Sequence, residues 1–313
     1  MKRLILRLVC FFLALLAVPL GYFAWVQSLP AMSRGSLMGS ILIKQQLAEN
    51  TPGARILVVG GSSVPYSIQC EVIQQQTGMP CIAMGATAYL GLEYYLSLLE
   101  DHLHQGDLVI LAPEIVMLQD QVSYSTTWMA VENDPGLLAA VPLSYWPGMV
   151  SGYYTYSRQK LDLYRQKGAP AQSPQEQYEA FGFGPWGDIP GQRESLLESG
   201  YDKNNILTLT GDDLAPRVRR AIKDFAKKAQ AVGARVVMTW APFDELAYAG
   251  TADQLDALQA QLEQQTGLAY LGSLAESMLP GELFYDSNNH LTSQGAELRT
   301  QMLLEDLFAA GLV

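Results

Sequence analysis

The stretch RILVVGGSS at residues 55–63 is the part of the chain that decides the fold. Its first half is short and rich in β-branched side chains, which is typical of a strand buried on both faces. Gly60 and Gly61 then end the run and allow the backbone to turn sharply. Similar runs occur at residues 80–84, 107–112, 235–239 and 268–271. Because helical patterns alternate with them, the sequence predicts an α/β fold with a doubly wound, five-stranded parallel sheet.

Helices are expected on both sides of this sheet. The clearest follows Pro216, where apolar residues recur every three or four positions until Gly233. Further helices are expected at residues 36–50, 69–76, 90–104, 253–265 and 292–310.

The pattern lapses after the third strand, and residues 119–213 form a large insertion. This segment is rich in Tyr, Trp, Gly, Pro and Gln, with helical stretches near residues 133–140 and 151–166 and a loop over 168–200. So long a loop inside a compact domain is usually functional or disordered, and its aromatic residues argue against disorder.

The N-terminal residues 1–30 resemble a membrane anchor. Lys2, Arg3 and Arg7 precede an uncharged apolar run at residues 8–26, which is long enough to cross a bilayer. We therefore expect a single-pass protein of the cytoplasmic (inner) membrane, with residues 31–53 as a linker helix and residues 54–313 as an extracytoplasmic (periplasmic) domain. Two alternatives remain, a cleaved signal peptide that leaves a secreted protein and a buried helix of a soluble one.

Composition and charge exclude several classes of protein. Hydrophobic residues make up 49% of the chain and charged residues 16%, which excludes wholesale disorder. The net charge of −11 makes nucleic acid an unfavourable partner.

The three cysteines, Cys10, Cys70 and Cys81, match no disulfide scaffold and no zinc motif. Counting helical rise between Cys70 and Cys81 gives a separation on the order of 11 Å, whereas a disulfide needs Cα atoms within about 7 Å. Free, buried thiols are expected.

Candidate chemistry gathers at the carboxyl ends of the strands, where open parallel sheets bind ligands. Ser62 and Ser63 follow the first strand directly. Of the three histidines, His102 and His104 lie in a polar helix end, where solvated side chains are expected. His290 follows Asp286 by four residues, so a short loop can bring the carboxylate to one imidazole nitrogen and leave the other free as a base. The alternative is a turn that only caps the last helix.

These residues resemble the motifs of SGNH/GDSL hydrolases. The segment from Val58 to Ser63 resembles their first block, Ala83-Met84-Gly85 their second, and Asp286 to His290 their last. The likeness covers residues 54–118 and 234–310. Closest in style are membrane-tethered relatives that work beside membrane-bound O-acyltransferases, such as alginate O-acetylation proteins and the D-alanyl-transfer protein of teichoic acids.

The resemblance implies a serine esterase or O-acyltransferase that acts on an acylated polysaccharide, without a cofactor or metal. Ser62 is the implied nucleophile, His290 the base and Asp286 its partner, with the Ser62 and Gly85 amides as the oxyanion hole. The implied protein partner is a membrane-bound O-acyltransferase. Further residues expected at the site are Ser63, Glu114 and Trp240 as lining, and Phe183 and Trp186 as a groove that stacks on sugars.

Three departures from the family pattern leave alternatives open. Gly61 replaces the usual Asp before the nucleophile, Ala112-Pro113-Glu114 stands in place of a Gly-x-Asn-Asp block, and Asp286 and His290 are four residues apart where three is usual. An inactive, glycan-binding or scaffolding subunit of a polysaccharide modification or export complex would tolerate these changes. A flavodoxin-like nucleotide- or phosphate-binding protein is the other alternative, although the glycine turn lacks a Walker lysine.

Overall fold

The computed structural model describes residues 2–132, 134–166 and 182–313. Its centre is a parallel sheet of four strands in the order β2-β1-β3-β4. The strands are β1 (Ile56–Gly60), β2 (Cys81–Ala83), β3 (Leu108–Ala112) and β4 (Arg235–Met238). Every residue of β1 and β3 is buried, as the apolar runs predict. Since all four strands are parallel, their carboxyl ends lie along one edge of the sheet.

The expected fifth strand is not formed. At residues 268–271 a single parallel bridge joins Met238 to Tyr270, and the Leu271 N–H donates to the Met238 carbonyl at 2.7 Å. The run is short because Gly267 and Gly272 on either side of it both have positive φ, so the chain turns at each end. A separate parallel pair, β5 (Phe243–Asp244) and β6 (Met278–Leu279), was not expected.

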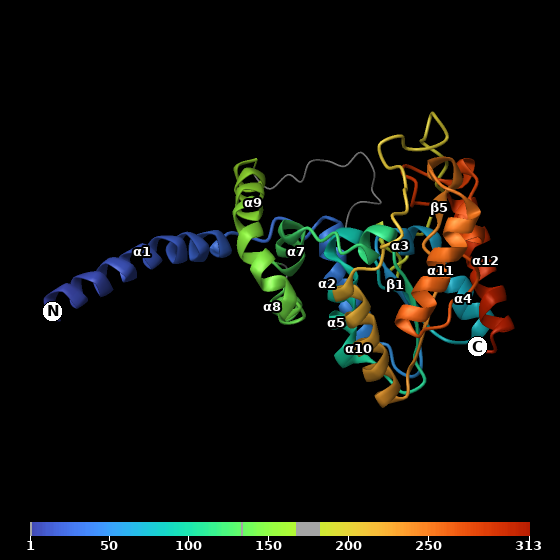
Figure 1. Ribbon diagram of the computed structural model, residues 1–313, viewed down its shortest axis with the longest axis horizontal. Coiled ribbons are helices and arrows are strands. Elements are labelled where there is room, and N and C mark those ends of the chain that lie inside the picture. The colour runs from blue at the N-terminus through green and yellow to red at the C-terminus, as the bar shows by residue number, and fades with distance from the viewer. Residues whose placement is uncertain (1, 133, 167–181) are drawn as a thin grey trace.

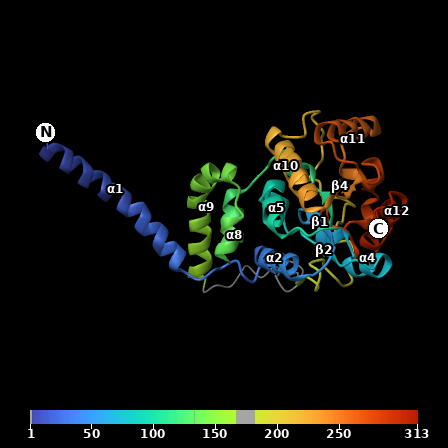
Figure 2. The same cartoon turned by 90° about the horizontal axis from the view of Figure 1, so that it is seen from below.

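Helices cover both faces of the sheet (Figures 1 and 2). One face packs against α2 (Ser40–Asn50), α5 (Leu92–Leu99), α10 (Pro216–Val232) and α11 (Ala252–Thr266), and the other against α4 (Cys70–Thr77) and α12 (Ser293–Ala309). Alternate residues of β1 divide between these two cores: Leu57 and Val59 enter the first, Ile56 and Val58 the second. The doubly wound arrangement follows from this alternation.

Several short helices have no counterpart in the sequence pattern. They are α3 (Ser63–Ser67), α6 (Ile115–Leu118) and α7 (Tyr124–Val131). By contrast, α8 (Pro135–Ala139) and α9 (Trp146–Arg165) lie close to the helical stretches expected at residues 133–140 and 151–166. The α7 sequence is rich in aromatic and β-branched residues, which lower helix propensity. Its helix is stabilised instead by a Ser123 cap and by burial of Trp128.

The first half of the insertion packs against the N-terminal helix α1 (Lys2–Ser28) and lies beside the sheet domain (Figure 1). The Phe23 ring lies 5.0 Å from Tyr153 and 6.1 Å from Trp128, and the Tyr22 hydroxyl donates to Ser157 at 3.0 Å. Residues 167–181 of the insertion lie outside the described residues. Within the described residues, no helix is long and apolar enough to cross a membrane. The anchor therefore stays a prediction.

Helix α2 packs into the main body through a buried lysine. The Lys44 ammonium donates to the carbonyls of Ala83, at 2.8 Å, and Gly187. Burial lowers the pKa of Lys44 to about 7. The end of β2 and the insertion are thereby tied to a segment that the sequence suggested was a linker.

Cys70 and Cys81 are free and buried, as expected, but the distance argument was wrong. Their sulfur atoms lie 3.3 Å apart. Gly78 is in the left-handed region and turns the chain back at the end of α4, and the residues before β2 return alongside the helix and offset much of its rise of ~1.5 Å per residue. Cys81 therefore comes back to the level of Cys70.

Candidate active site

Ser62 lies at the carboxyl end of β1 and caps the short helix α3. The turn that carries it is tightly enclosed. A Cβ atom at Gly61 would clash with the Glu114 carboxylate, and one at Gly85 would clash with the Gly61 carbonyl. Both positions therefore require glycine, and the Gly85 backbone lies directly against the Ser62 turn.

Three side chains meet at this turn. The Ser62 Oγ lies 2.9 Å from His290 Nε2, and His290 Nδ1 lies 2.8 Å from the Asp286 Oδ1. The side chains of His290 and Asp286 are 9% and 12% exposed, so the chain of hydrogen bonds is largely shielded from water. The spacing of Asp286 and His290 predicted the contact between these two residues, whereas the contact of His290 with Ser62 was expected from the resemblance.

A tight loop accommodates the four-residue spacing. The Tyr285 N–H donates to the His290 carbonyl at 2.7 Å, and an antiparallel bridge pairs Phe284 with Leu291. The two ends of the loop are thus held together as in a hairpin. One additional residue fits within it while Asp286 still reaches the imidazole.

The His290 ring is held flat against Tyr66. Their centroids are 4.0 Å apart and their planes differ by 8°, and Tyr285 stacks on the other side of this cluster, 6.2 Å from Tyr66. Tyr66 lies on α3, four residues after Ser62. The helix that starts at the serine therefore also orients the imidazole.

Arg193, in the insertion, joins the two halves of the site and could not be recognised from the sequence. Its guanidinium donates to the carbonyls of Ile189 (2.6 Å), Tyr66 (3.3 Å) and Leu291 (3.3 Å), and its backbone N–H donates to Ser293. It is 5% exposed, and burial lowers the pKa of its guanidinium. No local motif marks it, since an isolated arginine in a loop-like segment is typical of a solvated side chain.

Glu114 contacts the turn that carries Ser62. It follows β3, which pairs with β1 so that Ala112 lies opposite Gly60. Its Oε1 accepts the Ser63 N–H at 3.0 Å and fills the space that the missing side chain of Gly61 leaves. The Ser63 side chain is fully buried, and its hydroxyl has no partner among the described residues.

The predicted aromatic residues lie apart from the reacting atoms. Trp240 is 2% exposed and packs on Tyr270 at 5.1 Å, so it is part of the core. Trp186 packs against both cores, and its carbonyl accepts the Ala83 N–H at 2.9 Å. Phe183 packs against the cluster of Tyr66, Ile189 and Tyr285. Of the three, only Phe183 touches residues that hold His290.

Groups of side chains that could hold a metal ion are not found in the described ranges. No three or more His, Cys, Asp or Glu side chains come together there in a way suited to one.

Comparisons with known proteins assign no family to this chain. No model of a protein family matches the chain, and no curated protein matches it. Among the solved structures similar to this chain is one named as "a putative platelet activating factor from Streptococcus pneumonia". The two are 13% identical with a TM-score of 0.33, and the match covers 88% of this chain and 92% of the other.

Proposed function

We propose that the protein is a serine esterase or O-acyltransferase that acts outside the cytoplasm on acyl esters of a cell-surface or exported polysaccharide. The observation that supports this most is the hydrogen-bonded series from Ser62 through His290 to Asp286. Such a series activates a serine hydroxyl for acyl transfer because the histidine takes its proton and the carboxylate stabilises the resulting cation.

In this mechanism, the Ser62 oxygen attacks the ester carbonyl while His290 takes the serine proton. The negative charge on the carbonyl oxygen faces the backbone amides of Ser62 and Gly85. His290 then gives the proton to the departing alcohol, which leaves an acyl group on Ser62. Water or a sugar hydroxyl next attacks the acyl group, with His290 as base, and restores the serine. Water gives hydrolysis and the hydroxyl gives transfer.

A fluorophosphonate probe tests this proposal directly because it reacts with activated serines. We expect the wild-type protein and Ser63→Ala to be labelled, and Ser62→Ala and His290→Ala to remain unlabelled. Ser63 is the matched control because it neighbours Ser62 but is fully buried. If the wild type is neither labelled nor able to hydrolyse 4-nitrophenyl acetate, the inactive glycan-binding or scaffolding subunit becomes the better account.

We also propose that residues 1–30 attach the protein to the inner membrane, beside a membrane-bound O-acyltransferase. Leu15, Val18 and Leu20 of α1 are 55%, 74% and 63% exposed, and apolar side chains in water favour transfer to lipid. We expect the protein to fractionate with membranes and its C-terminal domain to be cut by protease added from outside. Release by high salt without detergent would refute the attachment.

A further inference from the structure

A small pocket lies beside the Ser62 turn. Its volume is about 170 Å³, and Glu114 and Asn289 form part of its wall. Glu114 is the residue that accepts the Ser63 N–H, and Asn289 directly precedes His290. The pocket therefore adjoins both the segment that carries the serine and the loop that carries the base.

The walls combine polar and apolar groups in a distinctive way. Carboxylate and amide side chains come from Glu114, Gln119, Gln121, Asn205 and Asn289, and apolar side chains come from Ile115, Val116, Ile206, Leu207 and Phe243. Amides both donate and accept hydrogen bonds, whereas a carboxylate only accepts. Ligands that match this set carry several hydroxyl groups and also an apolar face, which describes a sugar ring.

The volume of the pocket and the charge around it further restrict the class of ligand that can bind. At ~30 Å³ per water-sized group the pocket holds about six such groups, which suits a single sugar ring. Glu114 is 8% exposed, and no ion pair to it is found in the parts of the chain that the structure describes. With a net charge of −11 on the whole chain, a uronate would be repelled here.

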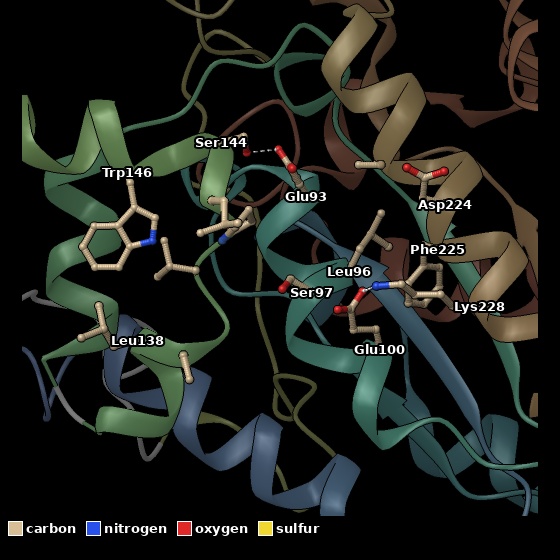
Figure 3. Close-up of a pocket in the computed structure, with 15 residues that line it drawn as sticks. Glu93, Leu96, Ser97, Glu100, Leu138, Ser144, Trp146, Asp224, Phe225 and Lys228 are labelled. Atoms are coloured by element: carbon tan, nitrogen blue, oxygen red, sulfur yellow. Dashed lines mark hydrogen bonds and ion pairs between the residues drawn. The ribbon is translucent and has the colours of Figure 1, made fainter.

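A larger pocket of about 560 Å³ between α5, α10 and the start of α9 is a weaker candidate (Figure 3). Neither pocket contains Ser62, His290 or Asp286, but the larger one also contains no residue that contacts the Ser62 turn and none that adjoins His290 in the sequence. Its carboxylates are already partnered, since Glu93 accepts from Ser144 at 2.9 Å and Glu100 pairs with Lys228. A ligand there would have to break the ion pair of Glu100 with Lys228. Beside Glu114, Gln121 donates to Gln119 and Asn205 to Asn289, but each amide keeps a donor or an acceptor that these bonds do not use.

We propose that the pocket beside Glu114 binds one neutral pyranose residue of the polysaccharide and holds it next to Ser62. This inference rests on the proposed function and assigns its sugar subsite. This subsite lies apart from the aromatic groove expected from Phe183 and Trp186, which stays a prediction, since neither residue lines this pocket.

Binding is measured with the full-length Ser62→Ala protein, so that no turnover interferes. Neutral trisaccharides of glucose, galactose or mannose and the acidic trigalacturonate are titrated while amide NMR shifts are followed. We expect at least one neutral trisaccharide to bind, and trigalacturonate to bind at least about tenfold more weakly, which corresponds to ~1.4 kcal/mol.

Substitutions in the wall of the pocket test whether the sugar binds there. We expect Asn205→Ala and Phe243→Leu each to weaken binding of the neutral sugar about fivefold, from the loss of a hydrogen bond or of an aromatic contact. Asn205 is exposed, so its replacement should not disturb folding. Gln261→Ala is the matched control, since this amide lines a different pocket of about 260 Å³ and should leave binding unchanged.

The outcomes separate the two proposals. If the wild type reacts with the fluorophosphonate but no neutral trisaccharide binds, the sugar subsite is wrong and the esterase stands. If sugar binds with the expected variant pattern but no serine is labelled, the catalytic proposal fails and the subsite stands. Equal binding of trigalacturonate, or an equal effect of Gln261→Ala, overturns the subsite.

Discussion

Arg193 should matter more for the site than any other residue of the insertion, and Arg193→Met tests this. The substitution keeps an unbranched apolar stem of similar length but removes the three guanidinium bonds to Ile189, Tyr66 and Leu291. A bond from a charged donor contributes ~1.5–3 kcal/mol when well formed. Two of these three bonds are long at 3.3 Å, so we expect a loss of about 3 kcal/mol in the free energy of unfolding.

For a chain of 313 residues, such a loss corresponds to a fall in melting temperature of about 5 °C. Reactivity should fall as well, because the bonds tie the helix of Tyr66 to the loop that follows His290. A displacement of about 1 Å between serine and histidine lowers the rate on the order of 100-fold. The assay is the rate of fluorophosphonate labelling, measured well below the melting transition.

Two further variants make the result interpretable. Arg193→Lys keeps the charge and part of the bonding, so it should fall between wild type and Arg193→Met. Arg219→Met removes an exposed arginine of α10 whose side chain reaches only Gln265 among the described residues, and it should change neither quantity. The reasoning fails if Arg193→Met melts within about 2 °C of the wild type and is labelled equally fast.

Three other substitutions probe separate parts of the fold. Gly85→Ala should slow labelling on the order of 100-fold, because the new methyl group displaces the Gly61 carbonyl beside Ser62. Burial raises the pKa of Asp244 to about 6, so the unfolded state loses this proton first and the folded state loses stability as pH rises from about 4 to about 6. Relative to wild type, Asp244→Asn should therefore gain about 3 kcal/mol in urea unfolding at pH 8 and nothing near pH 3. Trp186→Ala should lower unfolding free energy by about 3 kcal/mol and slow hydrolysis of small and polymeric esters alike.

The strands could be predicted because their burial leaves a clear trace in the sequence. Residues 56–60 and 108–112 are covered on both faces, and only apolar or small residues are found there. The fifth strand failed for a local reason, since the glycines at 267 and 272 confine the run to a single bridge. A short apolar run alone does not specify how many of its residues will pair.

Spacing in the chain predicted one contact of the site, whereas Ser62 and Glu114 were expected there from the ends of the strands and from the family resemblance. Asp286 and His290 lie in one loop, and their meeting could be inferred from spacing alone. The contacts of Tyr66, Glu114 and Arg193 depend on segments that are distant in sequence, and no local pattern encodes them. The roles of these residues in catalysis stay predictions until labelling is measured.

The cysteine pair shows a different kind of error. The expected separation included the helical rise but not the extended return of the chain after Thr77. A correct value requires the path of the residues between the helix and the strand, which recognition of the βαβ unit does not supply.

The distance in sequence between Ser62 and His290 has a consequence for biosynthesis. The two residues are 228 positions apart, so the ribosome releases the serine and α3 long before it adds the histidine. A growing chain therefore carries Ser62 without His290. Under the proposed function, no acyl-enzyme forms until the loop at residues 285–290 has been made and packs on Tyr66, and reactivity would begin only when this final segment of the domain has folded.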